Sequence, residues 1–172
     1  MLKNEHYSED EIEATNLFID KKCKCNNRFC FPVITEEGNV AGLLMRRSNN
    51  VTIPIWLNLT YQEAYLGANI VTDYEYVIVC EGPMDVIACL ESGYTNVIMA
   101  NGVLTDDQLF YLKRFNKIIF AFDKDECGKR LLSKYMTKMT ENNIPCEVLD
   151  FAGLDVYQAY KNGKLIQVKT HL

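Results

Sequence analysis

Long apolar runs are missing from this sequence of 172 residues. A helix that crosses a membrane needs about 20 consecutive apolar residues. No run here approaches that length, so we expect no contact with a membrane. Residues 1–18 also lack the apolar stretch of a secretory signal peptide. Together these absences predict a cytoplasmic protein.

Histidine is scarce, and the cysteines do not pair by number. The chain has two histidines and seven cysteines. Four of the cysteines lie within apolar or helical patterns, as reduced cysteines do in intracellular proteins. Cys23, Cys25 and Cys30 form a C-x-C-x4-C group, but a structural zinc site needs four ligands and His6 is the only other candidate nearby. The pattern favours ordinary reduced thiols over a zinc site.

The net charge of −5 is distributed unevenly. Residues 21–50 contain six basic residues and two acidic ones, which gives this segment a charge of +4. An acidic protein can still bind nucleic acid where a local basic face meets the phosphates. The segment therefore predicts either a nucleic-acid contact or a solvated basic surface.

The first part of the chain predicts a helix followed by a hairpin. A capping box at Ser8 predicts a helix that ends at about Phe18. Two apolar runs, 29–34 and 40–47, surround a glycine-containing connection, which is typical of a β-hairpin. We expect these elements to form a small N-terminal subdomain.

Two further elements complete that subdomain. The run 51–59 is strand-like, and Pro54 within it indicates an edge strand or a bulge. Residues 62–68 are consistent with a short helix, and a polar connection follows. We place the boundary near residue 72, which gives an N-terminal subdomain over 1–72 and a second domain over 73–172.

Apolar runs alternate strictly with helical patterns in the second domain. The expected strands cover 76–80, 96–100, 117–122 and 146–150. The expected helices cover 83–92, 106–115, 127–141 and 155–161. Continuous apolar strands that alternate with helices are typical of a parallel sheet with helices on both faces. The sequence therefore predicts an α/β fold, with a parallel doubly wound sheet and a small α+β N-terminal subdomain.

Carboxylates follow two of the expected strands directly. Glu81 follows the first strand, with Asp85 four residues later, and Asp123 and Asp125 follow the third. Asp155 lies beyond the fourth strand. The carboxyl ends of parallel strands are where ligands bind in such sheets. Clustered like charges repel one another, so this arrangement indicates that a cation or a proton lies among them.

The chemistry of these acids favours one class of metal. Oxygen ligands without histidine or cysteine are suited to Mg²⁺ or Mn²⁺, and Mg²⁺ commonly binds substrate phosphates as well. Each acid also has a simpler interpretation. Asp155 is well placed to be only the N-cap of a helix. Asp85 is well placed to orient the turn after Glu81 without contacting the metal.

The two acidic motifs resemble those of a known family. EGPMD and DKDECG are similar to the paired E-G-x-x-D and D-x-D-x-x-G signatures of the TOPRIM domain, which primases, topoisomerases, certain nucleases and recombination mediators share. Nearly the whole chain resembles the RNA-polymerase core of bacterial DnaG-type primases. NRFCFPVITEEGNVAGLLMRR, WLNL and LDVYQAY resemble segments of that core, although Tyr157 replaces its second D-P-D acid.

The resemblance implies a role for each candidate residue. Glu81 would act as general base or acid, and Mg²⁺ or Mn²⁺ would be held by Asp123, Asp125 and Asp155, with Asp85 as a further candidate ligand. The resemblance places Arg28 and Arg46 at template or nucleotide phosphates. We also expect Arg47, Lys124 and Lys129 to bind nucleic acid or nucleotides.

Three functions remain open on this evidence. The first is metal-dependent RNA primer synthesis, with single-stranded DNA and nucleoside triphosphates as partners and a replicative helicase or another replication protein as a further one. The second is a TOPRIM nuclease. The family's lysine-bearing segment is shortened here to TYQEAYLGANIV without a lysine, which favours this function or the third. The third is a non-catalytic nucleic-acid-binding module, against which the intact acidic set argues.

Overall fold

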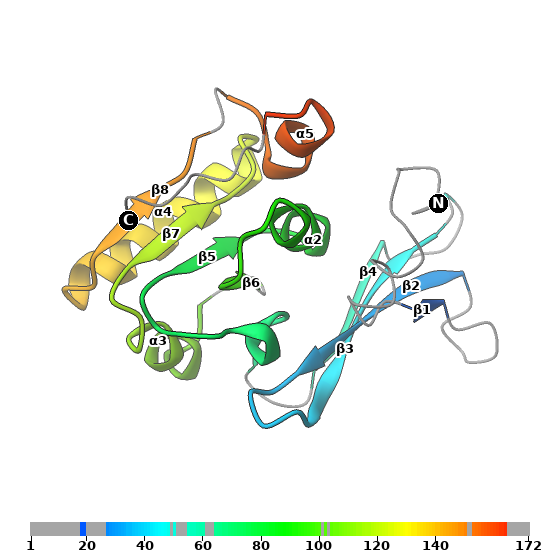
Figure 1. Cartoon of the computed structure of the whole chain (residues 1–172), viewed down its shortest axis with the longest axis horizontal. Helices are drawn as coiled ribbons and strands as arrows, with labels where there is room; N and C mark the ends of the chain where they lie inside the picture. Colours follow the sequence, from blue (N-terminus) through cyan, green and yellow to red (C-terminus); the bar gives the residue numbers. More distant parts are fainter. Residues whose placement is uncertain are drawn as a thin grey trace. The chain divides into compact units, whose positions relative to one another are not determined.

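The chain divides into two compact units, residues 1–64 and residues 65–172 (Figure 1). The computed structural model describes residues 18–19, 27–48, 50, 55–60, 64–100, 102, 104–150 and 153–164. Within these ranges no helix has the length and apolar character needed to span a membrane.

The first unit is a four-stranded antiparallel sheet in the order β1-β2-β3-β4. Its strands are β1 (Phe18–Ile19), β2 (Arg28–Ile34), β3 (Val40–Arg47) and β4 (Trp56–Thr60). The predicted hairpin is confirmed as β2 and β3, whose turn contains Gly38 at φ 84°. β4 lies at the edge of the sheet, as predicted, whereas Pro54 lies outside the described residues.

Strand β1 corrects one end of the predicted N-terminal helix. Phe18 does not end a helix but pairs with Cys30 of β2. The remainder of that predicted helix, residues 8–17, lies outside the described residues. Cys30 itself is a buried free cysteine in β2, while Cys23 and Cys25 lie outside the described residues. An apolar residue is compatible with a helix or a strand, and the backbone pairing with β2 makes this segment a strand.

The second unit contains the predicted parallel sheet. Its strands are β5 (Val77–Cys80), β6 (Val97–Met99), β7 (Ile118–Ala121) and β8 (Cys146–Val148), in the order β6-β5-β7-β8. All three neighbouring pairs are parallel. The first three strands are buried along their whole length, which explains why their sequences are continuously apolar. The predicted α/β fold is confirmed.

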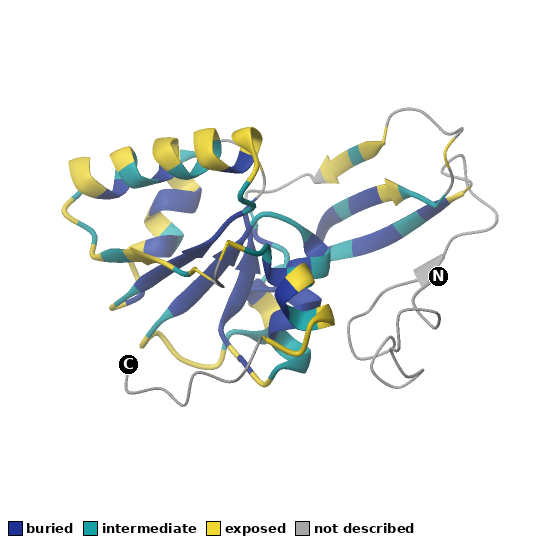
Figure 2. Ribbon diagram, turned by 90° about the horizontal axis from the view of Figure 1, so that it is seen from above, coloured by how far each residue is buried: buried dark blue, intermediate teal, exposed yellow. Residues whose placement is uncertain are grey.

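Helices cover both faces of this sheet (Figures 1 and 2). They are α2 (Pro83–Glu91), α3 (Asp106–Leu112), α4 (Glu126–Glu141) and α5 (Val156–Lys161). Leu112 of α3 and Tyr135 of α4 share one core with Phe120 of β7. On the other face, the sulfur of Cys80 lies 3.9 Å from that of Cys89 in α2. In the sheet, β6 lies on one side of β5, and β7 and β8 lie on the other, as in a doubly wound sheet.

The connection before β5 differs from the predicted short helix over 62–68. Of the described residues in that range, Leu66 is extended and forms an antiparallel bridge with Met99. A short 3₁₀ helix, η2 (Ala68–Ile70), follows. Gly67 has φ 96°, and a Cβ there would meet the Val97 carbonyl oxygen at 2.4 Å. This pairing attaches the connection to β6, so the second unit begins earlier than the expected boundary near residue 72.

Candidate active site

The acidic site lies where β5 and β7 end side by side. Cys80 and Ala121 are paired near the ends of these strands, and Glu81 and Asp123 follow them. The backbone N–H of Asp123 donates a hydrogen bond of 3.3 Å to Oε2 of Glu81. The structure therefore brings together two of the carboxylates that the sequence predicts at the site.

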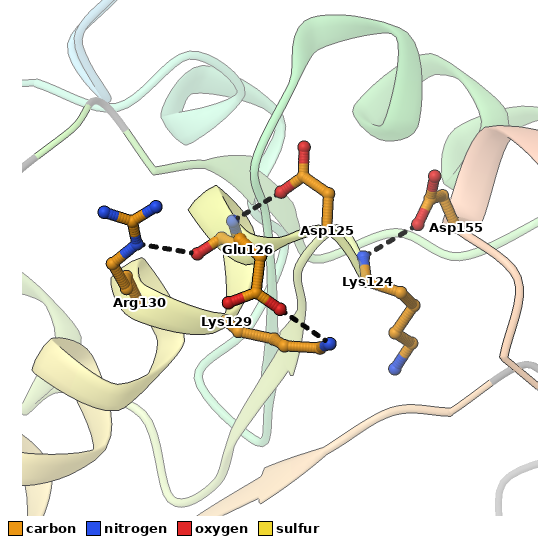
Figure 3. A network of polar contacts seen from close by, with 7 residues as sticks. Lys124, Asp125, Glu126, Lys129, Arg130 and Asp155 are labelled. Atoms are coloured by element: carbon orange, nitrogen blue, oxygen red, sulfur yellow. Dashed lines mark hydrogen bonds and ion pairs between the residues drawn. The ribbon is translucent and has the colours of Figure 1, made fainter.

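Asp125 begins α4 and also faces this end of the sheet. Its Oδ1 accepts a hydrogen bond of 2.8 Å from the N–H of Gly128, as an N-cap residue does (Figure 3). Only one carboxylate oxygen takes part in this bond. In Figure 3 the other oxygen points away from the helix. Asp125 can therefore cap α4 and still offer an oxygen to a ligand.

Gly128 allows the two acidic loops to approach each other. A Cβ at this position would meet the Asp123 carbonyl oxygen at 2.2 Å and Oε2 of Glu81 at 2.7 Å. The first of these atoms is backbone and cannot move aside as a flexible side chain can. The sequence motif contains this glycine, but only the structure shows that a side chain there would collide with both Glu81 and Asp123.

Replacing Gly128 with alanine is expected to destabilise the protein by about 1–3 kcal/mol, as overpacking does. Without a clash, the same change within a helix would stabilise it by about 0.5–1 kcal/mol. The free energy of unfolding, measured with urea, therefore shows by the sign of its change whether the added methyl group clashes. The control is Ser133→Ala, at an exposed position of α4, which is expected to have little effect. A Gly128→Ala protein more stable than the wild type would contradict the contact.

Asp155 joins the site from the beginning of α5. Its Oδ1 accepts a hydrogen bond of 2.8 Å from the N–H of Lys124, which lies between Asp123 and Asp125 (Figure 3). No hydrogen bond from its own helix reaches the Asp155 side chain. The carboxylate is therefore directed at the loop after β7 and does not serve merely as an N-cap.

The two lysines predicted at this site point elsewhere in the structure. Nζ of Lys124 lies 3.4 Å from Oδ1 of Asp150 and 3.4 Å from the Leu149 carbonyl oxygen. Nζ of Lys129 lies 3.3 Å from Oε1 of Glu126, on the exposed side of α4. In this arrangement the backbone of Lys124 supports the acidic site, and its ammonium group links the loops that follow β7 and β8.

Asp85 is buried and connects two helices. Its Oδ2 accepts from the N–H of Gly82 at 3.1 Å, and its Oδ1 accepts from the N–H of Tyr157 at 3.1 Å. At the other end of α2, Glu91 accepts a hydrogen bond from the Tyr160 hydroxyl. These contacts attach α5 to α2 at two points. They favour the interpretation that Asp85 orients the site over the prediction that it binds the metal directly.

Burial and neighbouring charges raise the pKa values of three carboxyl groups at the site. Burial raises the pKa of Glu81, and the charges of Asp123, Asp125 and Asp155 add to the effect. Burial and the same kind of repulsion raise the pKa of Asp123, and they raise that of Asp85 to about 7. In the absence of a cation the site thus holds protons more tightly than ordinary carboxyl groups do.

The side chains fit Mg²⁺ or Mn²⁺ only as partial ligands. Within the described ranges, no three His, Cys, Asp or Glu side chains are grouped closely enough to hold a metal ion by themselves. Burial is the main cause of the raised pKa values of Glu81 and Asp123, and repulsion between carboxylates, which a cation would relieve, adds to it. Mg²⁺ usually keeps several waters and binds through one or two carboxylates together with substrate phosphates. An open set of acids is compatible with that mode of binding.

The predicted basic residues of the first unit differ in accessibility. Arg28 is only 2% exposed, and its Nη1 donates to the Ile55 carbonyl oxygen at 3.3 Å. Arg46 is exposed, and its guanidinium lies over the ring of Trp56. Nη1 of Arg47 lies 3.4 Å from the Asn50 carbonyl oxygen. As placed, Arg28 stabilises the sheet, whereas Arg46 reaches solvent.

A family model described as Toprim-like matches residues 78–158. This range contains every acid of the site described above. Residues 78–158 are similar to Toprim-like domains. The resemblance of EGPMD and DKDECG to the TOPRIM signatures is thereby confirmed. Among the contacts in this range that the sequence did not reveal are those of the Tyr157 backbone and the Tyr160 side chain, because both join residues far apart in the chain.

Curated relatives and solved structures extend the comparison. A DNA primase of Campylobacter jejuni is 34% identical over 79 residues, which cover 45% of this chain and 13% of the relative. A DnaG catalytic core superposes with a TM-score of 0.77 at 18% identity and covers 94% of this chain and 66% of that one. A DnaG primase catalytic domain bound to single-stranded DNA superposes with a TM-score of 0.69 at 22% identity. The alignment covers 95% of this chain and 58% of that one.

These matches extend the fold assignment beyond the Toprim-like domain. The structural alignments cover nearly the whole chain, so both units share the fold of DnaG catalytic cores. The chain spans between 13% and 36% of the lengths of the four curated relatives, all of which are DNA primases.

Proposed function

We propose that this chain performs primase-like nucleotidyl transfer, either by itself or as a component of a larger enzyme. The reaction would synthesise an RNA primer on single-stranded DNA from nucleoside triphosphates. The main support is the position of Glu81 beside the Asp123 backbone at adjacent strand ends of a Toprim-like domain. The DNA primases among the relatives support the same reaction.

The residues proposed to hold Mg²⁺ or Mn²⁺ are Asp123, Asp125 and Asp155. In nucleotidyl transfer such an ion, when bound, neutralises the charge of the reacting phosphate and favours ionisation of the attacking hydroxyl. The hydrogen bonds of Asp125 with Gly128 and of Asp155 with Lys124 fix one oxygen of each carboxylate. Their second oxygens are the proposed ligands.

Glu81 is the proposed general base. Burial and the neighbouring carboxylates raise its pKa, which increases its tendency to take a proton from the attacking 3′-hydroxyl. The Asp123 N–H holds Oε2, which leaves Oε1 to receive the proton. Arg46 and Arg47 are proposed to bind phosphates, and a replicative helicase is proposed as a protein partner.

The test is incorporation of labelled nucleoside triphosphates on a single-stranded DNA template with Mg²⁺ or Mn²⁺. The proposal predicts short products that require both template and metal. Shortening of the template in the same reactions, without new product, would instead identify a nuclease. If neither activity is found in the presence of metal and all four nucleotides, catalysis by this chain alone is contradicted.

Metal binding is expected to raise the melting temperature of the wild-type protein. A ligand that binds only the folded state at about 100 times its Kd stabilises that state by about 2.7 kcal/mol. Asp123→Asn is expected to lose this shift. In metal-free buffer the same variant is expected to melt at a higher temperature than the wild type, because repulsion from Asp155 and Asp125 is removed.

The matched control for this experiment is Asp106→Asn, since Asp106 is an exposed carboxylate in the first turn of α3. Its metal-dependent shift should equal that of the wild type. A lower metal-free melting temperature for Asp123→Asn, or an undiminished shift with metal, would count against Asp123 as a ligand.

A further inference from the structure

The hairpin of the first unit has charges of opposite sign at its two ends. At one end, the register pairs Arg28 with Arg47 and Phe29 with Arg46. At the other end, the turn carries Glu36 and Glu37. The sequence that leads into the basic end, residues 21–28, contains four basic residues and no acid. A polyanion would therefore be attracted to the end that carries Arg46 and repelled by the turn.

An exposed tryptophan lies at that same basic end. Trp56 is paired with Arg46 on the edge strand β4 and is 40% exposed. The guanidinium carbon of Arg46 lies 5.6 Å from the centre of the Trp56 ring. The ring of Phe31, which is itself 5% exposed, lies 6.4 Å from that of Trp56 and is tilted by 43° to it. Contacts with Phe31 and Arg46 hold the tryptophan ring while leaving much of it accessible.

We infer that Trp56 and Arg46 form a stacking site for an unpaired base of single-stranded nucleic acid. An aromatic ring stacks on any base, and an adjacent arginine adds a cation–π contact and attracts the phosphates. A duplex is a poor occupant because its bases are already stacked on one another. The inference rests on the proposed function for its ligand class. It adds Trp56, which lies outside the Toprim-like domain, as a binding residue.

Trp56 is the single tryptophan of the chain, so its fluorescence reports on this site alone. The experiment titrates the full chain with oligo(dT), oligo(U), a duplex of equal length and an abasic oligomer with the same number of phosphates. Stacking predicts strong quenching by oligo(dT) or oligo(U) and little by the duplex or the abasic oligomer. Absence of quenching by both single strands, or equal quenching by the abasic oligomer, would overturn the inference.

Variants test the same site through labelled oligonucleotide anisotropy. Trp56→Ala is expected to raise the Kd for oligo(dT) about tenfold, as the loss of one stacked base does. Trp56→Phe should retain most of the affinity. Leu59→Ala is the matched control, because Leu59 is 42% exposed on the same strand but lies three residues away, on the opposite face. An unchanged Kd in a folded Trp56→Ala protein, checked by circular dichroism, would overturn the inference.

The two proposals fail in different ways. Nucleotide incorporation that is unaffected by Trp56→Ala at limiting template would overturn the stacking site and leave the proposed reaction intact. Quenching by single strands without any incorporation would support the stacking site and contradict the proposed reaction. The comparison of oligo(dT) with oligo(U) shows whether DNA or RNA is the preferred strand.

Discussion

Glu81→Gln is expected to lower the rate of nucleotide incorporation by about 10²- to 10⁴-fold, the usual contribution of a general base. Glutamine has the size of glutamate and keeps an oxygen that can accept from the Asp123 N–H. It cannot take a proton from the attacking hydroxyl. The variant should therefore retain its fold and its affinity for single-stranded DNA. The measurement is the initial rate at saturating template and nucleotide.

The stability of the variant and the pH dependence of its rate show whether Glu81→Gln affects catalysis or folding. Because Glu81 is repelled by Asp123, the metal-free Glu81→Gln protein should be at least as stable as the wild type. In the wild type the rate should rise with pH through the raised pKa of Glu81, and this rise should be absent from the residual rate of the variant. Glu126→Gln, at an exposed position of α4, is the control and should keep full activity. A Glu81→Gln protein whose initial rate is within threefold of the wild-type rate would exclude Glu81 as the general base.

In metal-free buffer, the free energy of unfolding is expected to fall as the pH rises from about 4 to about 8. Asp85 provides the largest part of this change, because its pKa is raised from 3.8 to about 7 in the folded protein. A raised pKa means that the folded state binds the proton more tightly than the unfolded state does. The stabilisation is complete below pH 3.8 and is lost as the pH rises through about 7. The difference corresponds to about 4 kcal/mol.

The effect of Asp85→Asn on the free energy of unfolding should change sign between pH 5 and pH 8. At pH 5 the variant loses one backbone hydrogen bond and should be less stable than the wild type by about 1 kcal/mol. At pH 8 it carries no buried charge and should be the more stable protein. Urea-induced unfolding in EDTA at both pH values measures this. The control is again Asp106→Asn, which should keep the wild-type pH dependence. If the free energy of unfolding changes with pH equally in Asp85→Asn and in the wild type, Asp85 is not the source of the pH dependence.

The arrangement of the parallel sheet could be predicted because each strand carries its own signal. VIVC, VIM and IIFA are buried on both faces, and such strands have no polar alternation that could be mistaken for a surface strand. Thr105 and Asp125 mark helix starts by local hydrogen bonds with Gln108 and Gly128, three residues away. Interactions within one turn of helix are visible in the sequence itself.

The contacts that could not be predicted join distant parts of the chain. Tyr157 and Asp85 are 72 residues apart, and nothing near either residue indicates their hydrogen bond. Arg28 is basic and was predicted to contact phosphate, yet the sheet buries it against Ile55. Lys124 lies between two site acids, but the salt bridge with Asp150 turns its side chain away. Leu66 fits a helix locally, and only the edge of β6 makes it extended.

The attachment of α5 to α2 also determines when the site can form during synthesis. α5 has six residues, too few to be a stable helix without tertiary contacts. Ribosomes add about 5–20 residues per second, so the chain up to Asp125 emerges seconds before α5 does. Until then Asp155 is absent and the N–H of Lys124 lacks its acceptor. A nascent chain can thus complete the β5–β7 core before Asp155 arrives, so the Toprim-like site is completed only after the core that carries it has formed.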